Sequence, residues 1–296
     1  MNTPYLGLMA VGVLLCGALL QLRLHQRKMR WLPVLPSVLL GAAMAKISYV
    51  VLQWHYAFPR WEWSAFWIFQ EDTFCFVGGA VGAVLGIALS ARLTKQPVLK
   101  ALDAFAPTGA LMAAIARFGE KYLGLIGTAG FEMLESLSFF PFALTNEWGE
   151  SYPAVFMLSC LAALAVAVVG FCVKKEKCSG GLFFRTAFYL ALPQIMLESF
   201  LAECMKWGFV RVQQVLCALI LLFVLIAECR RCTQMSFWKK WRPIAILLLC
   251  IIGLVGVEFA LDKSNLPTFV CYGMMFLLLC AIAALEHTTF KRIVSS

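Results

Sequence analysis

The residues best suited to chemistry are charged side chains embedded in long apolar segments, namely Lys46, Arg117, Glu120, Glu198, Glu203 and Lys206. An ionised group inside a hydrocarbon layer costs roughly 2.5–3.5 kcal/mol on insertion scales, so it needs a function or a partner. An arginine can hold an anionic phosphate through two parallel hydrogen bonds. A carboxylate can act as a base or as a counter-ion. These residues therefore mark the candidate functional region, and Arg117 is the candidate phosphate ligand.

The same residues have a second interpretation as internal ion pairs. Arg117 precedes Glu120 by three positions, and Glu203 precedes Lys206 by the same interval. Residues three apart share one face of a helix, so each pair can neutralise itself. A pair of this kind can hold helices together without any further role.

The elements that must position these residues are transmembrane helices. The chain has 296 residues, of which 62% are hydrophobic and 14% charged, which excludes a soluble globular domain. Nine apolar segments are long enough to cross a bilayer, and they lack the alternation of a membrane barrel. We predict an all-α polytopic membrane protein with spans at residues 5–22, 31–52, 73–89, 99–118, 153–173, 181–202, 210–227, 243–261 and 266–285.

Basic residues in the short loops predict the orientation, because such residues stay on the cytoplasmic side. Most of the 25 Lys and Arg residues lie in alternate loops and in the tail. The prediction is a multi-pass protein of the bacterial inner membrane, with its N-terminus outside and its C-terminus in the cytoplasm. The first span is expected to be retained, since no signal-peptide pattern surrounds it. The net charge of +9 then indicates attraction to anionic lipid headgroups, and we expect no nucleic-acid partner.

Two regions are predicted. Residues 1–229 form a seven-helix core, whose long loop at 120–152 lies at the outer membrane interface because aromatic residues alternate there with acids. Residues 230–296 comprise a basic cytoplasmic loop and an extra two-helix hairpin. Most of the 12 cysteines lie in spans as small apolar residues. Cys229 and Cys232 have CxxC spacing but no second pair of ligands, so we expect no metal and no cofactor.

Several short motifs carry a resemblance to a known family. They are Ala45-Lys46-Ile47-Ser48-Tyr49, Val77-Gly78-Gly79-Ala80-Val81-Gly82, Leu102-Asp103-Ala104-Phe105-Ala106-Pro107, Ala116-Arg117-Phe118-Gly119-Glu120, Tyr152-Pro153 and Ser199-Phe200-Leu201-Ala202-Glu203-Cys204-Met205-Lys206. In order and spacing they resemble the phosphatidylglycerol–prolipoprotein diacylglyceryl transferases, the bacterial membrane enzymes that begin lipoprotein lipidation. The resemblance runs from about residue 5 to residue 228.

The sequence departs from that family at several positions. The family's histidine before the paired glycines corresponds to Val77, and its second arginine corresponds to Ser199. Its asparagine after the signature arginine corresponds to Glu120, and its basic residue in the second span to Lys46. The resemblance therefore implies a divergent member in which the usual imidazole is absent.

The resemblance also implies a reaction, in which a lipoprotein cysteine thiolate displaces glycerol phosphate from a diacylglyceryl group. Arg117 would stabilise the leaving phosphate, Glu120 would take the thiol proton, and Tyr49 or Tyr152 would assist. The implied substrate-binding residues are Lys46, Gly78, Gly79, Glu203 and Lys206. Gly78 and Gly82 also fit a small-xxx-small pattern that allows close helix packing without a ligand.

Three functions remain open at this point. The first is an active transferase that uses phosphatidylglycerol and a lipoprotein precursor. The second is a catalytically inactive relative that binds the phospholipid or the lipoprotein and serves another membrane protein. The third is a lipid transporter, which the absence of inverted repeats in the sequence disfavours.

Overall fold

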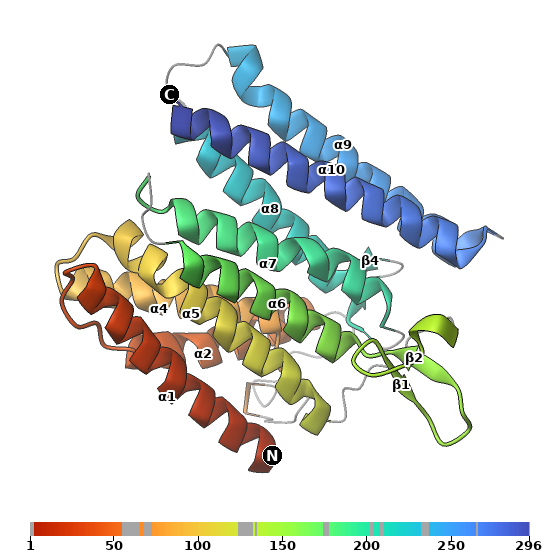
Figure 1. Cartoon of the computed structure of the whole chain (residues 1–296), viewed down its shortest axis with the longest axis horizontal. Coiled ribbons are helices and arrows are strands. Elements are labelled where there is room, and N and C mark those ends of the chain that lie inside the picture. The colour runs from red at the N-terminus through yellow and green to blue at the C-terminus, as the bar shows by residue number, and fades with distance from the viewer. Residues whose placement is uncertain are drawn as a thin grey trace. The chain divides into compact units, whose positions relative to one another are not determined.

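The protein is described by a computed structural model that covers residues 3–54, 66–67, 73–123, 133, 135–173, 178–201, 204–207, 210–231, 237–264 and 266–295. Within these ranges the chain is dominated by α-helices (Figure 1). They are α1 (Thr3–Gln26), α2 (Leu35–Leu52), α4 (Phe76–Leu93), α5 (Val98–Gly119), α6 (Val155–Cys172), α7 (Gly181–Ser199), α8 (Val212–Arg231), α9 (Phe237–Lys263) and α10 (Thr268–Ser295).

Eight of these helices are long and apolar enough to cross a membrane, so the prediction of an all-α polytopic membrane protein is confirmed. The remaining predicted span, 181–202, corresponds to α7, which is a helix but is not among the eight. Arg185, Gln194 and Glu198 lie on α7 and lower its apolar character. Eight of the nine predicted spans therefore have the composition of a membrane helix in the described part of the chain.

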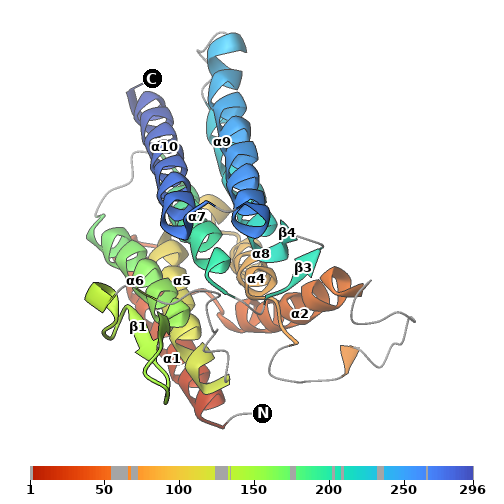
Figure 2. The same ribbon diagram turned by 90° about the vertical axis from the view of Figure 1, so that its right-hand side faces the viewer.

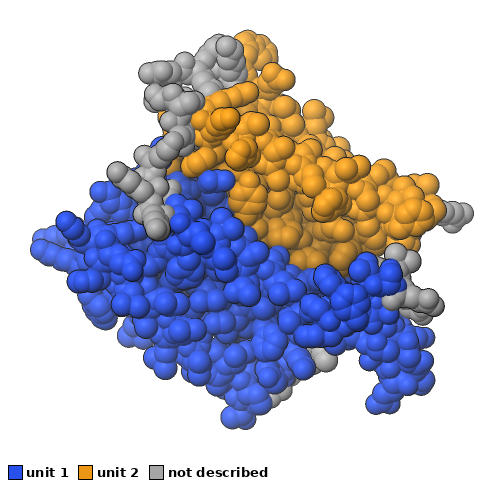
Figure 3. Space-filling view, in the orientation of Figure 1, with its two compact units in different colours: residues 1–186 blue, residues 187–296 orange. Residues whose placement is uncertain are grey.

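Two compact units divide the chain within α7, at Met1–Thr186 and Ala187–Ser296 (Figure 3). We call them unit 1 and unit 2. Internal contacts place this boundary between residues 186 and 187, whereas the loop composition predicts a boundary between residues 229 and 230. The boundary at residue 229 remains a prediction.

In unit 1, the packing of α2 against α4 depends on glycines. A Cβ atom added to Gly78 would lie 2.8 Å from the carbonyl oxygen of Met44, and one added to Gly82 would lie 2.7 Å from Met44 Cβ. One added to Gly86 would lie 2.5 Å from the carbonyl oxygen of Pro36. Because these glycines recur every four residues, they form one face on which α2 approaches closely.

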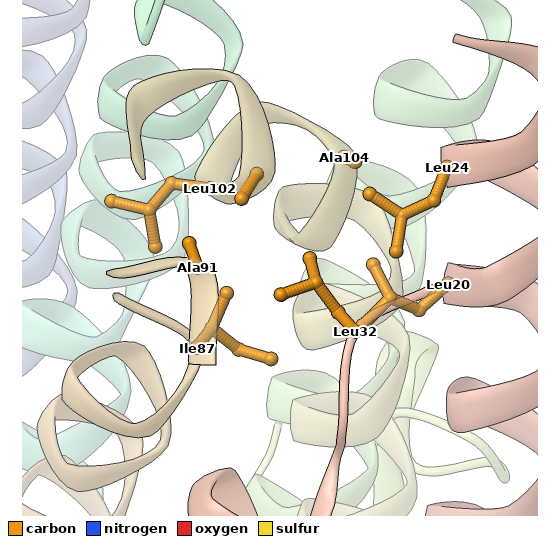
Figure 4. Packing of buried hydrophobic residues seen from close by; sticks show 8 residues of the cluster. Leu20, Leu24, Leu32, Ile87, Ala91, Leu102 and Ala104 are labelled. Atoms are coloured by element: carbon orange, nitrogen blue, oxygen red, sulfur yellow. The ribbon is translucent and has the colours of Figure 1, made fainter. Parts of the chain in front are cut away.

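The core of unit 1 joins α1, α4 and α5. Figure 4 shows how side chains of these helices and of the loop residue Leu32 converge. The cluster consists of Leu20, Leu24, Leu32, Ile87, Ala91, Ala101, Leu102 and Ala104. Leu32 is fully buried although it lies outside the helices, so it fixes the connection between α1 and α2 to the helical core.

Two polar side chains cap helix ends inside unit 1. Arg23 donates to the carbonyl oxygens of Gly170 at 3.1 Å and Val173 at 3.4 Å, which are at the carboxyl end of α6. Asp103 of α5 accepts hydrogen bonds from the backbone N–H groups of Gly180 at 2.5 Å and Phe183 at 3.0 Å. Both side chains satisfy backbone groups that a helix end leaves without an intrahelical partner.

The long loop after α5 contains structure that the sequence analysis did not predict. Short 3-10 helices occur at Glu120–Leu123 (η2) and Glu135–Leu137 (η3), followed by an antiparallel hairpin of β1 (Ala143–Thr145) and β2 (Ser151–Pro153). The Asn146 side-chain oxygen accepts from the N–H groups of Trp148 and Glu150, which closes the turn. Phe139 and Phe140 are exposed beside this hairpin.

Unit 2 contains α8, α9 and α10 together with a second small hairpin. The helices α9 and α10 run side by side as an antiparallel pair (Figures 1 and 2). Strands β3 (Lys206–Trp207) and β4 (Val210–Arg211) form the hairpin that precedes α8. The expectation that Glu203 and Lys206 share a helix face is wrong for Lys206, because α7 ends at Ser199 and Lys206 lies in a strand.

Candidate functional site

The ion pair expected between Arg117 and Glu120 is present at the end of α5. Arg117 Nη1 donates to Glu120 Oε1 at 2.7 Å. Arg117 lies in the last turn of the helix, and Glu120 begins η2, so the spacing of three residues brings the two groups together. The side chain of Arg117 is 6% exposed and that of Glu120 is 20% exposed. The carboxylate is therefore the more accessible partner.

Aromatic rings from two other helices enclose this pair. The Arg117 guanidinium lies 4.1 Å from the centre of the Phe76 ring at the start of α4, which is a cation–π contact. A Cβ atom added to Gly119 would lie 2.9 Å from the ring of Tyr5 in α1. Figure 1 shows the amino end of α1 beside the carboxyl end of α5. Three helices thus position Arg117.

A second buried cation lies near the same end of α4. Lys46 of α2 is buried, and its Nζ atom lies 5.6 Å from the ring centre of Tyr49 and 5.5 Å from that of Phe74. The backbone N–H of Cys75 donates to the carbonyl oxygen of Ala45 at 3.0 Å, which fixes the segment before α4 against α2. Residues 74–76 therefore carry the rings that contact both Lys46 and Arg117.

The local arrangement favours an anion. Lys46 is a buried cation near the amino end of α4, which carries a partial positive charge, and Arg117 contacts the same helix end while it is paired with Glu120. The site can bind a phosphate through charge and through the planar guanidinium of Arg117.

The remaining predicted residues lie elsewhere. Gly78 contacts α2, and Gly79 does so more loosely, since its added Cβ would be 3.3 Å from Ala45 Cβ. Their described role is helix packing, and their role in substrate binding stays a prediction. Lys206 is exposed on β3 in unit 2, and Glu203 lies outside the described residues. Val77 is buried in α4, next to Phe76.

The sequence analysis missed a second arginine–glutamate pair, which lies in unit 2. Arg211 Nε donates to Glu258 Oε1 at 2.7 Å. Ser199 Oγ donates to the other carboxylate oxygen at 2.7 Å, and Gln214 Nε2 donates to Ser199 Oγ at 2.7 Å. The signal available in the sequence was Glu258 itself, an acid inside the apolar segment 243–261 that needed a partner.

The β1–β2 hairpin holds a third carboxylate, at the surface. Glu150 Oε2 accepts from the Tyr152 hydroxyl at 2.8 Å and from the Asn146 amide at 2.7 Å. These hydrogen bonds, that from Tyr152 first, hold the pKa of Glu150 below its ordinary value of 4.5. The interaction organises the hairpin rather than the buried site.

The fold and the buried site define an α-helical, multi-pass membrane protein with two cations enclosed near the ends of its helices. Comparison of the sequence with known families gives a more specific result. The chain belongs to the prolipoprotein diacylglyceryl transferase family, whose sequence model matches residues 4–229. This range contains Lys46, Arg117 and Glu120.

Curated relatives agree with this assignment. A phosphatidylglycerol–prolipoprotein diacylglyceryl transferase of Clostridium novyi is 24% identical over 188 residues, which are 62% of this chain and 71% of that protein. The enzyme of the same name from Listeria innocua is 26% identical and covers 60% of this chain and 65% of its own length. The enzyme of the same name from Ligilactobacillus salivarius is 27% identical, over 66% of this chain and 74% of that protein. No solved structure matches the chain.

Proposed function

We propose that this protein binds phosphatidylglycerol and transfers its diacylglyceryl group to the cysteine thiol of a lipoprotein precursor. The observation that carries the proposal is the buried Arg117–Glu120 pair against Phe76, in the part of the chain that matches the family. The names of the curated relatives supply the two substrates. Lys46 supplies a second positive charge beside Phe74.

The proposed reaction begins when the lipid phosphate replaces Glu120 as a partner of Arg117. The planar guanidinium can hold two phosphate oxygens at once. The acceptor sulfur then forms a bond to the diacylglyceryl carbon while the C–O bond to phosphate breaks. Glycerol phosphate leaves with the electrons of that bond, and Arg117 stabilises its charge.

Glu120 is the group that we assign as base. The thiol is a weak nucleophile until its proton is removed. Displacement by phosphate would release the Glu120 carboxylate, which is partly exposed, to take that proton. Tyr49 lies beside Lys46 and would donate a hydrogen bond to the bound headgroup.

The alternative is a relative that binds lipid but does not transfer it. The same ion pair favours it, because Glu120 already neutralises Arg117, and a self-contained pair needs no substrate. In this case the protein would present phosphatidylglycerol or a lipoprotein precursor to another membrane protein.

The test is lipid transfer in vesicles that contain phosphatidylglycerol. The purified protein is mixed with a peptide that carries an acceptor cysteine, and mass spectrometry follows the addition of one diacylglyceryl group. We expect a product with the cysteine peptide and none with a serine peptide. Phosphatidylglycerol binding without product would favour the alternative, and neither binding nor product would contradict both functions.

Arg23 offers a matched control for Arg117. It is also a buried arginine beside a phenylalanine, with its guanidinium 5.1 Å from the ring centre of Phe171. It binds backbone carbonyls at the end of α6 and lies outside the proposed site. We expect Arg117→Lys to reduce transfer more than Arg23→Lys in samples of equal folded fraction. Equal losses would mean that Arg117 acts only through packing.

We further propose that the N-terminus lies outside and the C-terminus in the cytoplasm. The basic loops support this orientation. Termini on opposite sides require an odd number of membrane crossings. The helix α7 must therefore cross the membrane in addition to the eight more apolar helices. A reporter fused after residue 296 should be active only in the cytoplasm, and activity outside would overturn both the orientation and the crossing of α7.

A further inference from the structure

Unit 2 contains an apolar groove that the proposed transferase site does not use. Its volume is about 230 Å³, and most of its wall comes from α8 and α9. The lining residues are Ile195, Val210, Gln214, Val215, Ala218, Leu219, Leu222, Leu248, Ile251, Leu254, Val255, Glu258 and Met275. Both α8 and α9 are long and apolar enough to span a membrane, so the groove faces a hydrocarbon environment.

The groove is long and has polar groups at one end. Gln214 and Leu222 are eight residues apart on α8, which is about 12 Å along a helix. Glu258 and Leu248 are ten residues apart on α9, or about 15 Å. Gln214 lies near the start of α8 and Glu258 near the end of α9, and these two are the polar members of the wall.

The polar end is a built and electrically balanced site. Glu258 is buried and is held by Arg211 and Ser199, each at 2.7 Å. Gln214 Nε2 donates to the Ile195 carbonyl at 2.9 Å, and it lies 3.4 Å from Glu258 Oε2. Since Arg211 balances the charge of Glu258, a neutral hydrogen-bond donor fits this end better than a second cation.

We propose that this groove binds one lipid acyl chain, with a hydroxyl-bearing glycerol head at Glu258 and Gln214. The hydroxyl would donate to Glu258 Oε1, which accepts from Arg211, whereas Oε2 accepts from both Ser199 and Gln214. An apolar wall that ends in two polar groups matches a molecule with one apolar chain and one polar end. A transmembrane helix does not fit, since a helix with side chains is about 10–12 Å across and a single turn of it takes up more than the groove's volume of about 230 Å³.

This inference does not depend on the proposed transfer reaction. The groove uses α9 and Met275 of α10, and both lie beyond the residues 4–229 that match the family. The Arg117 site belongs to unit 1, whereas all groove residues belong to unit 2. A failure of the transfer experiment would therefore leave this proposal untouched.

The test is photolabelling of the full-length protein with a monoacylglycerol that carries a diazirine on its chain. We expect labelled peptides from α8 and α9, as mapped by mass spectrometry. The variant Ala218→Phe fills the groove and should reduce this labelling about tenfold, which corresponds to about 1.4 kcal/mol of binding free energy. The control Ala245→Phe adds the same ring at an exposed position of α9 outside the groove and should label like the wild type.

A second probe tests the polar end. It has the same chain and diazirine but ends in a methyl ester, which accepts hydrogen bonds and donates none. We expect it to label the groove more weakly than the monoacylglycerol does. Labelling spread over the lipid-facing helices and unchanged by Ala218→Phe would overturn the site, and equal labelling by both probes would overturn recognition of the hydroxyl. Unfolding temperatures of both variants would verify that the helices are intact.

Discussion

Two arginine–glutamate pairs in the described part of the chain have the same length and different surroundings. Arg117–Glu120 in unit 1 and Arg211–Glu258 in unit 2 are both joined at 2.7 Å. In the first pair the partners are three residues apart, and the carboxylate is 20% exposed. In the second they come from β4 and α9, and the carboxylate is 9% exposed. Arg117–Glu120 is therefore a local pair with an accessible carboxylate, and Arg211–Glu258 joins two elements that are distant in the sequence.

The two arginines also differ in their other contacts. Arg117 lies on the face of the Phe76 ring, with its guanidinium 4.1 Å from the ring centre. Arg211 Nη1 also donates to the carbonyl oxygens of Glu198, at 2.6 Å, and Leu201. It therefore satisfies backbone groups just where α7 ends. Arg211 thus holds the end of α7 in unit 2, whereas an exchange of partners by Arg117 is a step of the proposed reaction.

The largest expected effect is on turnover, from Glu120→Gln. Glutamine keeps the size and hydrogen bonding of the side chain but cannot accept the thiol proton. If Glu120 is the base, the transfer rate should fall by roughly 10²–10⁴-fold, the usual contribution of general base catalysis. Peptide lipidation per unit time measures this effect. A loss of only a few-fold, with the fold preserved, would assign Glu120 to charge neutralisation.

The next effect is on stability, from Arg211→Ala. Removal of one partner from a buried pair costs about 3–5 kcal/mol, because the other charge stays buried. Arg117→Ala should cost less, since Glu120 is the more exposed carboxylate and can reach polar surroundings. Denaturant unfolding in detergent compares the two variants. Equal losses of stability would contradict the distinction between the local pair Arg117–Glu120 and the pair Arg211–Glu258 that joins distant elements.

A smaller effect is expected on lipid affinity, from Arg117→Lys. Lysine keeps the charge but loses the planar pair of donors, so the affinity for phosphatidylglycerol should fall by about 1–2 kcal/mol. Arg23→Lys, at a buried arginine outside the proposed site, should leave this affinity unchanged in the protein that remains folded. Titration with phosphatidylglycerol in detergent provides the measurement, and identical affinities of wild type and Arg117→Lys would exclude bidentate binding.

The smallest effect concerns pH and the exposed carboxylate. Because the pKa of Glu150 is lowered in the folded hairpin, its stabilisation is complete above the ordinary value of 4.5 and is lost as the pH falls through the lower folded value. The protection of the Tyr152 amide against hydrogen exchange, relative to its intrinsic exchange rate at each pH, should therefore fall below about pH 4.5. Glu150→Gln should remove this dependence, and persistence of the dependence in that variant would assign it to another group.

The first pair was predictable from the sequence and the second was not. A spacing of three residues at a helix end brings Arg117 and Glu120 together without knowledge of the fold. Arg211 and Glu258 are separated by 47 positions, and only the packing of α8 and α9 makes them neighbours. The acid Glu258 in the apolar segment 243–261 indicated that a partner exists but not which residue it is.

Prediction of the fold from the sequence has the same limit, because contacts between distant residues are not visible in it. Apolar length alone predicts helices that cross a membrane, and eight of the nine segments have that composition. The hairpins at 143–153 and 206–211 have strands of two or three residues, which are too short for an alternating hydrophobic pattern to reveal them. The end of α7 at Ser199 likewise depends on Arg211, which comes twelve residues later and binds carbonyl groups there.

The cap that Asp103 provides has a consequence for the order of folding. The first N–H groups of α7 bind this carboxylate of α5, 77 and 80 positions earlier in the chain. Because α7 is less apolar than the other helices, hydropathy alone gives it a weak tendency to leave the translocon for the lipid. The helix can begin at Gly181 in its final form only after α5 is in place. Synthesis in the order of the sequence meets this condition, so a circularly permuted chain with α7 ahead of α5 would have to insert its least apolar helix uncapped.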